Sequence, residues 1–184
     1  MSRAPFVSAV CALLLACADS PLAPLSPYSA LVARVDGVPL ESFQRRDQLT
    51  SYPIAAYDTV LHVLWLGGSD TIRVQDIQFV VLRFHGPGRY TVCDDGPDTT
   101  VASVRRQHAA DPDSTEQFFA MAPCDDGFLI VDSVSLAGGT IAGRFEFTAR
   151  PWTSASPRVQ VREGRFEGGL LLFPMAPLVG VPPN

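Results

Sequence analysis

Turn-forming residues divide the sequence from Ala30 onward into short apolar segments. Asp36-Gly37, Gly86-Pro87 and Gly138-Gly139 are examples, and such signals recur about every 8 to 12 residues. Glycine, proline and aspartate at these points supply the backbone angles that tight turns need. No long stretch shows helical spacing between caps, although Leu40 to Leu49 has room for one or two helical turns. The spacing therefore predicts an all-β chain.

Strands are expected wherever apolar and β-branched residues gather between turn signals. The fold class that they predict is an antiparallel β-sandwich or barrel-like sheet of about ten strands. The expected strands are Leu31–Val35, Pro53–Tyr57, Val60–Leu66, Ile72–Phe84 with an interruption, Arg89–Cys93, Thr99–Gln107, Gln117–Ala122, Phe128–Val134, Thr140–Ala149, Arg158–Phe166 and an edge strand at Leu170–Phe173.

Alternation assigns faces to several of these strands. Phe145, Phe147 and Ala149 share one parity, which predicts the core side, and charged or polar residues take the other. In Arg158–Phe166 the alternation breaks, and a β-bulge or tight turn at Gly164 would return Phe166 to the core. Phe79 to Phe84 is apolar on both parities, which predicts a central strand covered on both faces.

The first residues have the pattern of an export signal. A short positive start, Met-Ser-Arg, precedes the apolar stretch Ala4 to Ala16, which would span about 20 Å as a helix. That is too short to cross a hydrocarbon core of about 30 Å. The stretch is therefore expected to be a signal peptide.

The end of this stretch, Leu14-Leu15-Ala16-Cys17, resembles the lipobox of bacterial lipoproteins. The resemblance implies that Cys17 receives lipid on its sulfur and becomes the mature N-terminus, which anchors the chain in a membrane. It implies residence in the bacterial cell envelope, at the outer membrane, facing the periplasm or the surface. The alternative is an A-x-A cleavage site at Ala16-Cys17-Ala18, which would release a soluble protein that begins at Asp19.

These signals divide the chain into four parts. Residues 1–16 are expected to be the signal peptide, and residues 17–30 the lipidated cysteine with a proline-rich spacer. Residues 31–173 form the expected all-β domain, and residues 174–184 a proline-rich tail.

Two segments near the C-terminus resemble a signature of small uncharacterised bacterial lipoproteins. Gly143 to Ala149 (GRFEFTA) and Val159 to Phe166 (VQVREGRF) match the pattern G-x-F-x-F-x-A followed by V-x-V-x-x-G-x-F. Val32 to Val38 and Gly88 to Tyr90 are similar to the family's first strand and central hairpin. The resemblance implies an all-β extracytoplasmic domain and no established activity.

Two cysteines, Cys93 and Cys124, remain in the mature chain under either route of processing. In an oxidising compartment two remaining cysteines are expected to form a disulfide, worth about 3 to 4 kcal/mol by loop-closure entropy. The alternative is a reactive thiol, which would need a neighbouring base.

Each of these cysteines begins the tetrapeptide Cys-Asp-Asp-Gly. If the sulfurs are bonded, Asp94, Asp95, Asp125 and Asp126 gather at one end of the sheet, where clustered carboxylates would suit Ca²⁺. The alternative is plain turn chemistry, since Asp-Gly favours turns without any metal.

Composition and motifs narrow the function classes. The 19 acidic and 14 basic residues give a net charge of −5, which argues against a nucleic-acid partner. The adjacent pairs Arg45-Arg46 and Arg105-Arg106 are expected on a solvated face or a strand edge. His62, His85 and His108 lack metal-ligand spacing.

We expect a non-enzymatic, membrane-tethered binding or accessory module whose partner is a protein, a glycan or a small ligand. One alternative is a carrier of a small apolar ligand in a barrel-like cavity. Another is a hydrolase that uses a carboxylate such as Asp94, Asp125 or Asp132. Asp132 shares the parity of Phe128, Ile130 and Val134, which would suit a partly buried carboxylate. At a strand end it is expected instead to bind backbone amides.

Overall fold

The structure is a computed structural model of the whole chain. It describes residues 30–43, 55–70, 75–93, 99–108, 111–120, 127–151 and 158–174. The expected signal peptide, Cys17, the spacer and most of the C-terminal tail lie outside these ranges.

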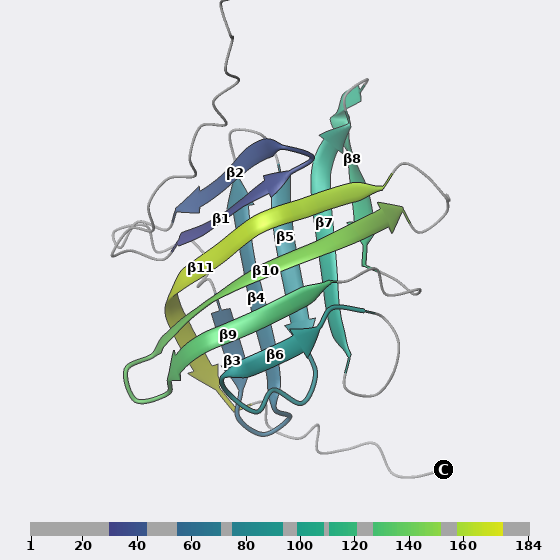
Figure 1. Cartoon of the computed structure of the whole chain (residues 1–184). Coiled ribbons are helices and arrows are strands. Elements are labelled where there is room, and N and C mark those ends of the chain that lie inside the picture. Colours follow the sequence, from purple (N-terminus) through teal and green to yellow (C-terminus); the bar gives the residue numbers. More distant parts are fainter. Residues whose placement is uncertain are drawn as a thin grey trace, which may run out of the picture.

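The described residues form eleven strands and no helix (Figure 1). The strands are β1 (Ala30–Val35), β2 (Val38–Phe43), β3 (Ala55–Asp58), β4 (Val63–Asp70), β5 (Gln75–Val81), β6 (Gly88–Thr91), β7 (Thr100–His108), β8 (Asp111–Phe119), β9 (Phe128–Ser135), β10 (Thr140–Pro151) and β11 (Val159–Phe173). The predicted all-β class is confirmed. No helix within the described residues has the length and apolar character needed to cross a membrane.

The strands build two layers that cross each other (Figure 1). The first layer has the order β2-β1-β11-β10-β9-β6, and the second has the order β3-β4-β5-β7-β8. All pairings inside the layers are antiparallel. Each layer covers the apolar face of the other, which is the arrangement of a sandwich or barrel-like sheet.

Two long strands join the layers at both edges. Leu170–Phe173, at the end of β11, pairs in parallel with β3, and Arg150 and Pro151, at the end of β10, pair with β8. The predicted edge strand at Leu170–Phe173 is therefore present, but it continues β11 instead of forming a separate strand. The sheet is continuous from one layer to the other.

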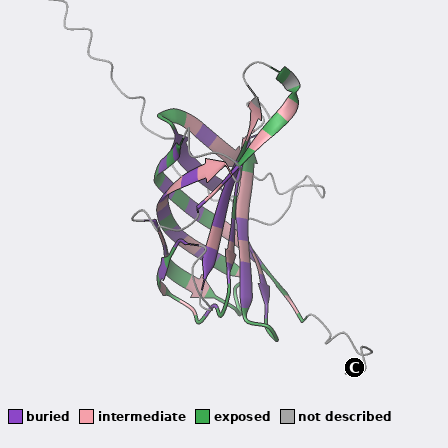
Figure 2. Ribbon diagram, turned by 90° about the vertical axis from the view of Figure 1, so that its right-hand side faces the viewer, coloured by how far each residue is buried: buried purple, intermediate pink, exposed green. Residues whose placement is uncertain are grey.

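The core lies between the layers and is filled by aromatic side chains. Phe79 from the second layer packs against Phe145 and Phe147 from the first, with ring centroids 4.9 and 5.4 Å apart. Phe166 lies 6.4 Å from Phe145, and all four rings are buried. Figure 2 shows buried and exposed positions alternating along the strands. The predicted inward face of β10 is confirmed.

The predicted irregularity near Gly164 is a β-bulge in β11. Against β10, Phe145 pairs with Gly164 but Phe147 pairs with Val161, so β11 carries an extra residue. Glu163 provides it, with a φ of 54°. The extra residue shifts the alternation by one, which turns Phe166 into the core after Val161.

Three expectations about local structure were wrong. Leu40 to Phe43 belongs to β2 and not to a helical turn, because Asp36 and Gly37, at φ of 50° and 79°, return the chain beside β1. Residues 44–49 lie outside the described residues. Val60 to His62 form a turn instead of a strand, since an Asp58 carboxylate oxygen accepts hydrogen bonds from the Val60 and Leu61 amides.

The third concerns Phe79 to Phe84, which is not covered on both faces. Val80 is half-buried on the outer side of the second layer, and Leu82 is exposed in the turn after β5. The apolar run therefore combines a central strand with an exposed apolar turn.

Gly164 is a sensitive position, because a Cβ there would overlap the ring of Phe145. We predict that Gly164→Ala lowers the free energy of unfolding by about 1 to 3 kcal/mol through overpacking. Urea denaturation measures this change. Glu167→Ala, at an exposed position of the same strand, is the control and should change stability by less than about 0.5 kcal/mol. Equal effects of the two substitutions would contradict the assignment.

Candidate binding surface

Cys93 lies just after β6, and its amide donates to the Thr100 carbonyl at 2.9 Å. Its side chain is 4% exposed, and the sulfur is disulfide-bonded. Cys124 lies outside the described residues, so the pairing of these two cysteines stays a prediction.

The four aspartates of the predicted calcium site also lie outside the described residues. They are Asp94, Asp95, Asp125 and Asp126. Elsewhere in the described ranges, no three His, Cys, Asp or Glu side chains gather in a way that could hold a metal ion. The calcium site therefore stays an untested prediction.

Asp132 is exposed, so it is not the partly buried carboxylate that its parity with Phe128 allowed. Leu129 and Val131 point into the core, which leaves Asp132 on the outer face of β9. A register shift against β10 falls at this position. The Asp132 carboxylate lies 3.8 Å from the Arg144 guanidinium with both side chains about half exposed, which gives a weak solvent-screened pair.

A row of polar residues closes the core at the end near the β1–β2 turn. Asp70, Gln75, Arg106 and Glu116 pair directly across β4, β5, β7 and β8. They continue the inward face beyond the apolar row that includes Ile77, Val104 and Phe118. This row marks where the apolar interior ends.

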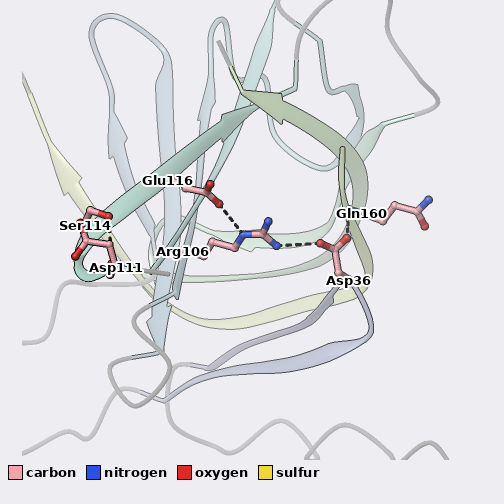
Figure 3. Close-up of polar contacts among 6 residues, drawn as sticks. All are labelled: Asp36, Arg106, Asp111, Ser114, Glu116 and Gln160. Carbon is pink, nitrogen blue, oxygen red and sulfur yellow. Dashed lines mark hydrogen bonds and ion pairs between the residues drawn. The ribbon is translucent and has the colours of Figure 1, made fainter. Parts of the chain in front are cut away.

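Arg106 holds this polar row to the other layer. As Figure 3 shows, its guanidinium bridges Glu116 at 3.4 Å and the Asp36 carboxylate at 3.1 Å. The second Asp36 oxygen accepts a hydrogen bond from the Gln160 amide at 2.8 Å. The guanidinium also lies over the Phe118 ring, 4.7 Å from its centroid. These contacts hold the two layers together at this end of the core.

The expectation of a solvated face is met by Arg105 only in part. Arg105 is half exposed on the outer face, where it binds the buried Asp76 directly across the β5–β7 pair. Arg106 shares the inward parity of Ala102 and Val104. Sequence parity along β7 was the signal that could have separated the two arginines.

His62, His85 and Trp65 have structural neighbours. The His62 Nδ1 atom lies 2.8 Å from the Tyr57 hydroxyl, and His85 lies beside Tyr90. Trp65 packs on Phe173 with ring centroids 5.6 Å apart. These contacts give no arrangement of a nucleophile with a base.

An open depression of about 290 Å³ lies where the bulge interrupts the first layer. Its lining comes from β9, β10 and β11: Phe128, Arg144, Phe145, Glu146, Glu163, Gly164 and Arg165. Charged groups and the half-buried Phe128 therefore line the depression, together with Phe145 and Gly164, which are buried. This composition suits a polar ligand.

The two acidic side chains at the depression already have hydrogen-bond partners. A Glu146 oxygen accepts a hydrogen bond from the Glu163 amide at 3.3 Å, which satisfies that amide at the bulge. The Glu163 carboxylate accepts a hydrogen bond from Arg34 Nε at 3.4 Å. Arg34 is buried, so this pair also neutralises a charge inside β1.

In the protein without a ligand, the positions of the two arginines at the depression are unfavourable. Arg144 and Arg165 lie directly opposite each other on β10 and β11, and like charges at such positions destabilise a sheet. The Arg165 side chain has no hydrogen-bond or ion-pair partner among the described residues. Two guanidinium groups at one depression can bind a carboxylate or a phosphate.

Comparisons with protein-family models, with curated proteins and with solved structures give no match for this chain.

Tyr90, on β6, has a buried phenol whose pKa is raised. Burial raises the pKa of its phenol, against two backbone hydrogen bonds that lower it. The hydroxyl donates to the Gly86 carbonyl at 2.6 Å and accepts from the His85 amide at 3.3 Å. The protonated form is therefore the one that the fold stabilises.

We predict a stability loss at alkaline pH that depends on Tyr90. Because the folded pKa is above the unfolded value, the stabilisation is complete below about pH 10 and is lost as pH rises through the folded pKa. Tyr90→Phe should cost about 1 kcal/mol at neutral pH and make the decline above pH 10 shallower. Denaturation at several pH values tests this, and equal alkaline slopes in both proteins would contradict it.

Proposed function

We propose that the chain is a lipid-anchored, extracytoplasmic binding module that recognises an acidic group of an envelope partner at the depression between β10 and β11. The observation that carries the proposal is the Arg144–Arg165 pair, because a bound anion would relieve its repulsion. Local arrangements that oppose stability are expected at functional sites. The acidic partner is a protein or a glycan that carries carboxylate or phosphate groups.

The cellular location of the module is proposed from the sequence. The lipobox-like Leu14-Leu15-Ala16-Cys17 supports lipidation of Cys17 and residence in the bacterial envelope, at the outer membrane. The disulfide at Cys93 fits an oxidising compartment, and we propose Cys124 as its partner.

The filled interior favours binding at the surface over transport of an apolar ligand. Phe79, Phe145 and Phe147 occupy the space between the layers, and the polar row that contains Arg106 closes one end. The proposal therefore places recognition on the outer face of the first layer.

Intact mass of the native protein tests the anchor. We predict a chain that begins at Cys17 and carries the added mass of fatty acyl groups. An unmodified chain that begins at Asp19 would contradict the anchor, although it would not bear on the binding surface.

Substitutions at the depression test the binding surface. We predict that Arg165→Gln raises the free energy of unfolding by about 0.2 to 1 kcal/mol, since it removes the repulsion with Arg144. Glu167→Gln, at an exposed position of the same strand opposite the uncharged Ala30 and Ala142, is the control and should change stability by less than about 0.5 kcal/mol.

Titration of the unsubstituted protein tests the ligand class. Titration with inorganic phosphate or acetate should shift the NMR signals of the Nε–H groups of Arg144 and Arg165, but not that of Arg162. The two anions distinguish phosphate from carboxylate recognition. Uniform shifts at all three arginines, together with no gain in stability for Arg165→Gln, would contradict the proposal.

A further inference from the structure

Four short segments meet at the end of the molecule opposite the polar row. They are the β3–β4 turn (59–62), the turn after β5 (82–87), the β9–β10 turn (136–139) and the end of β11 with Pro174 (171–174). In Figure 1 they lie at the lower end of the molecule.

Backbone hydrogen bonds connect these segments into one surface. The Thr59 amide donates to the Phe173 carbonyl at 3.3 Å, and the Phe84 amide donates to the His62 carbonyl at 2.6 Å. The Leu170 amide donates to the Gly139 carbonyl at 2.7 Å, which brings in the β9–β10 turn. We call this surface the apolar end.

The apolar end collects most of the exposed hydrophobic side chains. Of the eight large hydrophobic residues that are exposed in the described part of the chain, six lie here: Val60, Leu61, Leu82, Leu136, Leu171 and Leu172. Val60 and Leu61 are adjacent at the tip of a turn and are 51% and 55% exposed. Scattered exposed hydrophobics are normal, but a contiguous group indicates an interaction site.

The charge of the apolar end differs from that of the chain as a whole. Its four segments contain no Asp or Glu, and Arg83 is their one residue with a full charge at neutral pH. At the opposite end, Asp36, Asp111 and Asp113 are exposed. An apolar tip without acids, in a chain of net charge −5, is suited to the surface of a bilayer with anionic lipids.

We infer that the apolar end rests on a lipid bilayer, with Val60, Leu61 and Leu82 inserted at the level of the headgroups. The inference rests on the proposed function and deepens it, because it names which surface of the tethered domain faces the membrane. It leaves the outer face of the first layer accessible to a partner.

The chain between the anchor and the first strand is long enough for this contact. Twelve residues separate Cys17 from Ala30, and this stretch of chain spans at most about 45 Å. Ala30 pairs with Glu167, six residues before Phe173 on β11, which is about 20 Å along the strand. The bilayer that would hold Cys17 is therefore within reach of the apolar end.

The test uses the processed full chain in vesicles of phosphatidylethanolamine and phosphatidylglycerol, with some lipids brominated on the acyl chains. One variant, Leu61→Cys, carries an environment-sensitive fluorophore at the apolar end. The matched control is Val38→Cys, whose side chain is 45% exposed on β2. A second probe, Leu82→Cys, keeps the test valid if Leu61→Cys misfolds.

We expect brominated lipid to quench the probes at positions 61 and 82 several-fold more than the probe at position 38. Equal, weak quenching at all positions would overturn the inference. So would a blue shift at position 61 that depends on protein concentration and resists brominated lipid, because a second copy of the chain would then cover the apolar end.

The experiment distinguishes an absent lipid anchor on Cys17 from an absent contact between the apolar end and the bilayer. Protein that carries acyl mass and floats with the vesicles, yet shows no quenching at position 61, contradicts the contact alone. Protein without acyl mass that is still quenched at position 61 after mixing with vesicles contradicts the anchor and supports the contact.

Discussion

The structure depends on the way in which β11 pairs with three neighbours. Over its first part this 15-residue strand lies between β1 and β10, and its last four residues pair in parallel with β3. β11 therefore belongs to both layers, as β10 does through its pairing with β8. Among the described residues, each layer covers the apolar face of the other, so the core of Phe79, Phe145 and Phe147 depends on the register of β11.

The bulge in β11 couples this packing to the outer surface. Because Glu163 is an extra residue, Phe166 turns into the core and Arg165 turns outward opposite Arg144. In a regular register Phe166 would face solvent. The same bulge contributes Glu163 and Gly164 to the lining of the depression. The proposed binding surface is thus a consequence of how the strand keeps its core, and the arginine pair is its one unfavourable feature.

Sequence alternation predicted the class of fold, the inward face of β10 and the irregularity at Gly164, since each depends on neighbours along one strand. It missed β2, because Leu40 is held by pairing with Ala33 and not by a local preference. Parity placed Asp132 with Phe128 but did not say that their shared face is the outer one. The Arg144–Arg165 pair and the apolar end require knowing which strands and turns become neighbours, and no single segment of sequence carries that information.

Hydrogen exchange along β11, measured under conditions where global unfolding is rare, tests the central claim most directly. If β11 holds both layers together, the amides of Val161, Phe166 and Leu172 will exchange with one common free energy, equal to that of global unfolding. Exchange at Leu172 with a much lower free energy than at Val161 and Phe166 would contradict it, because the parallel join to β3 would then open while the rest of the sandwich stays folded.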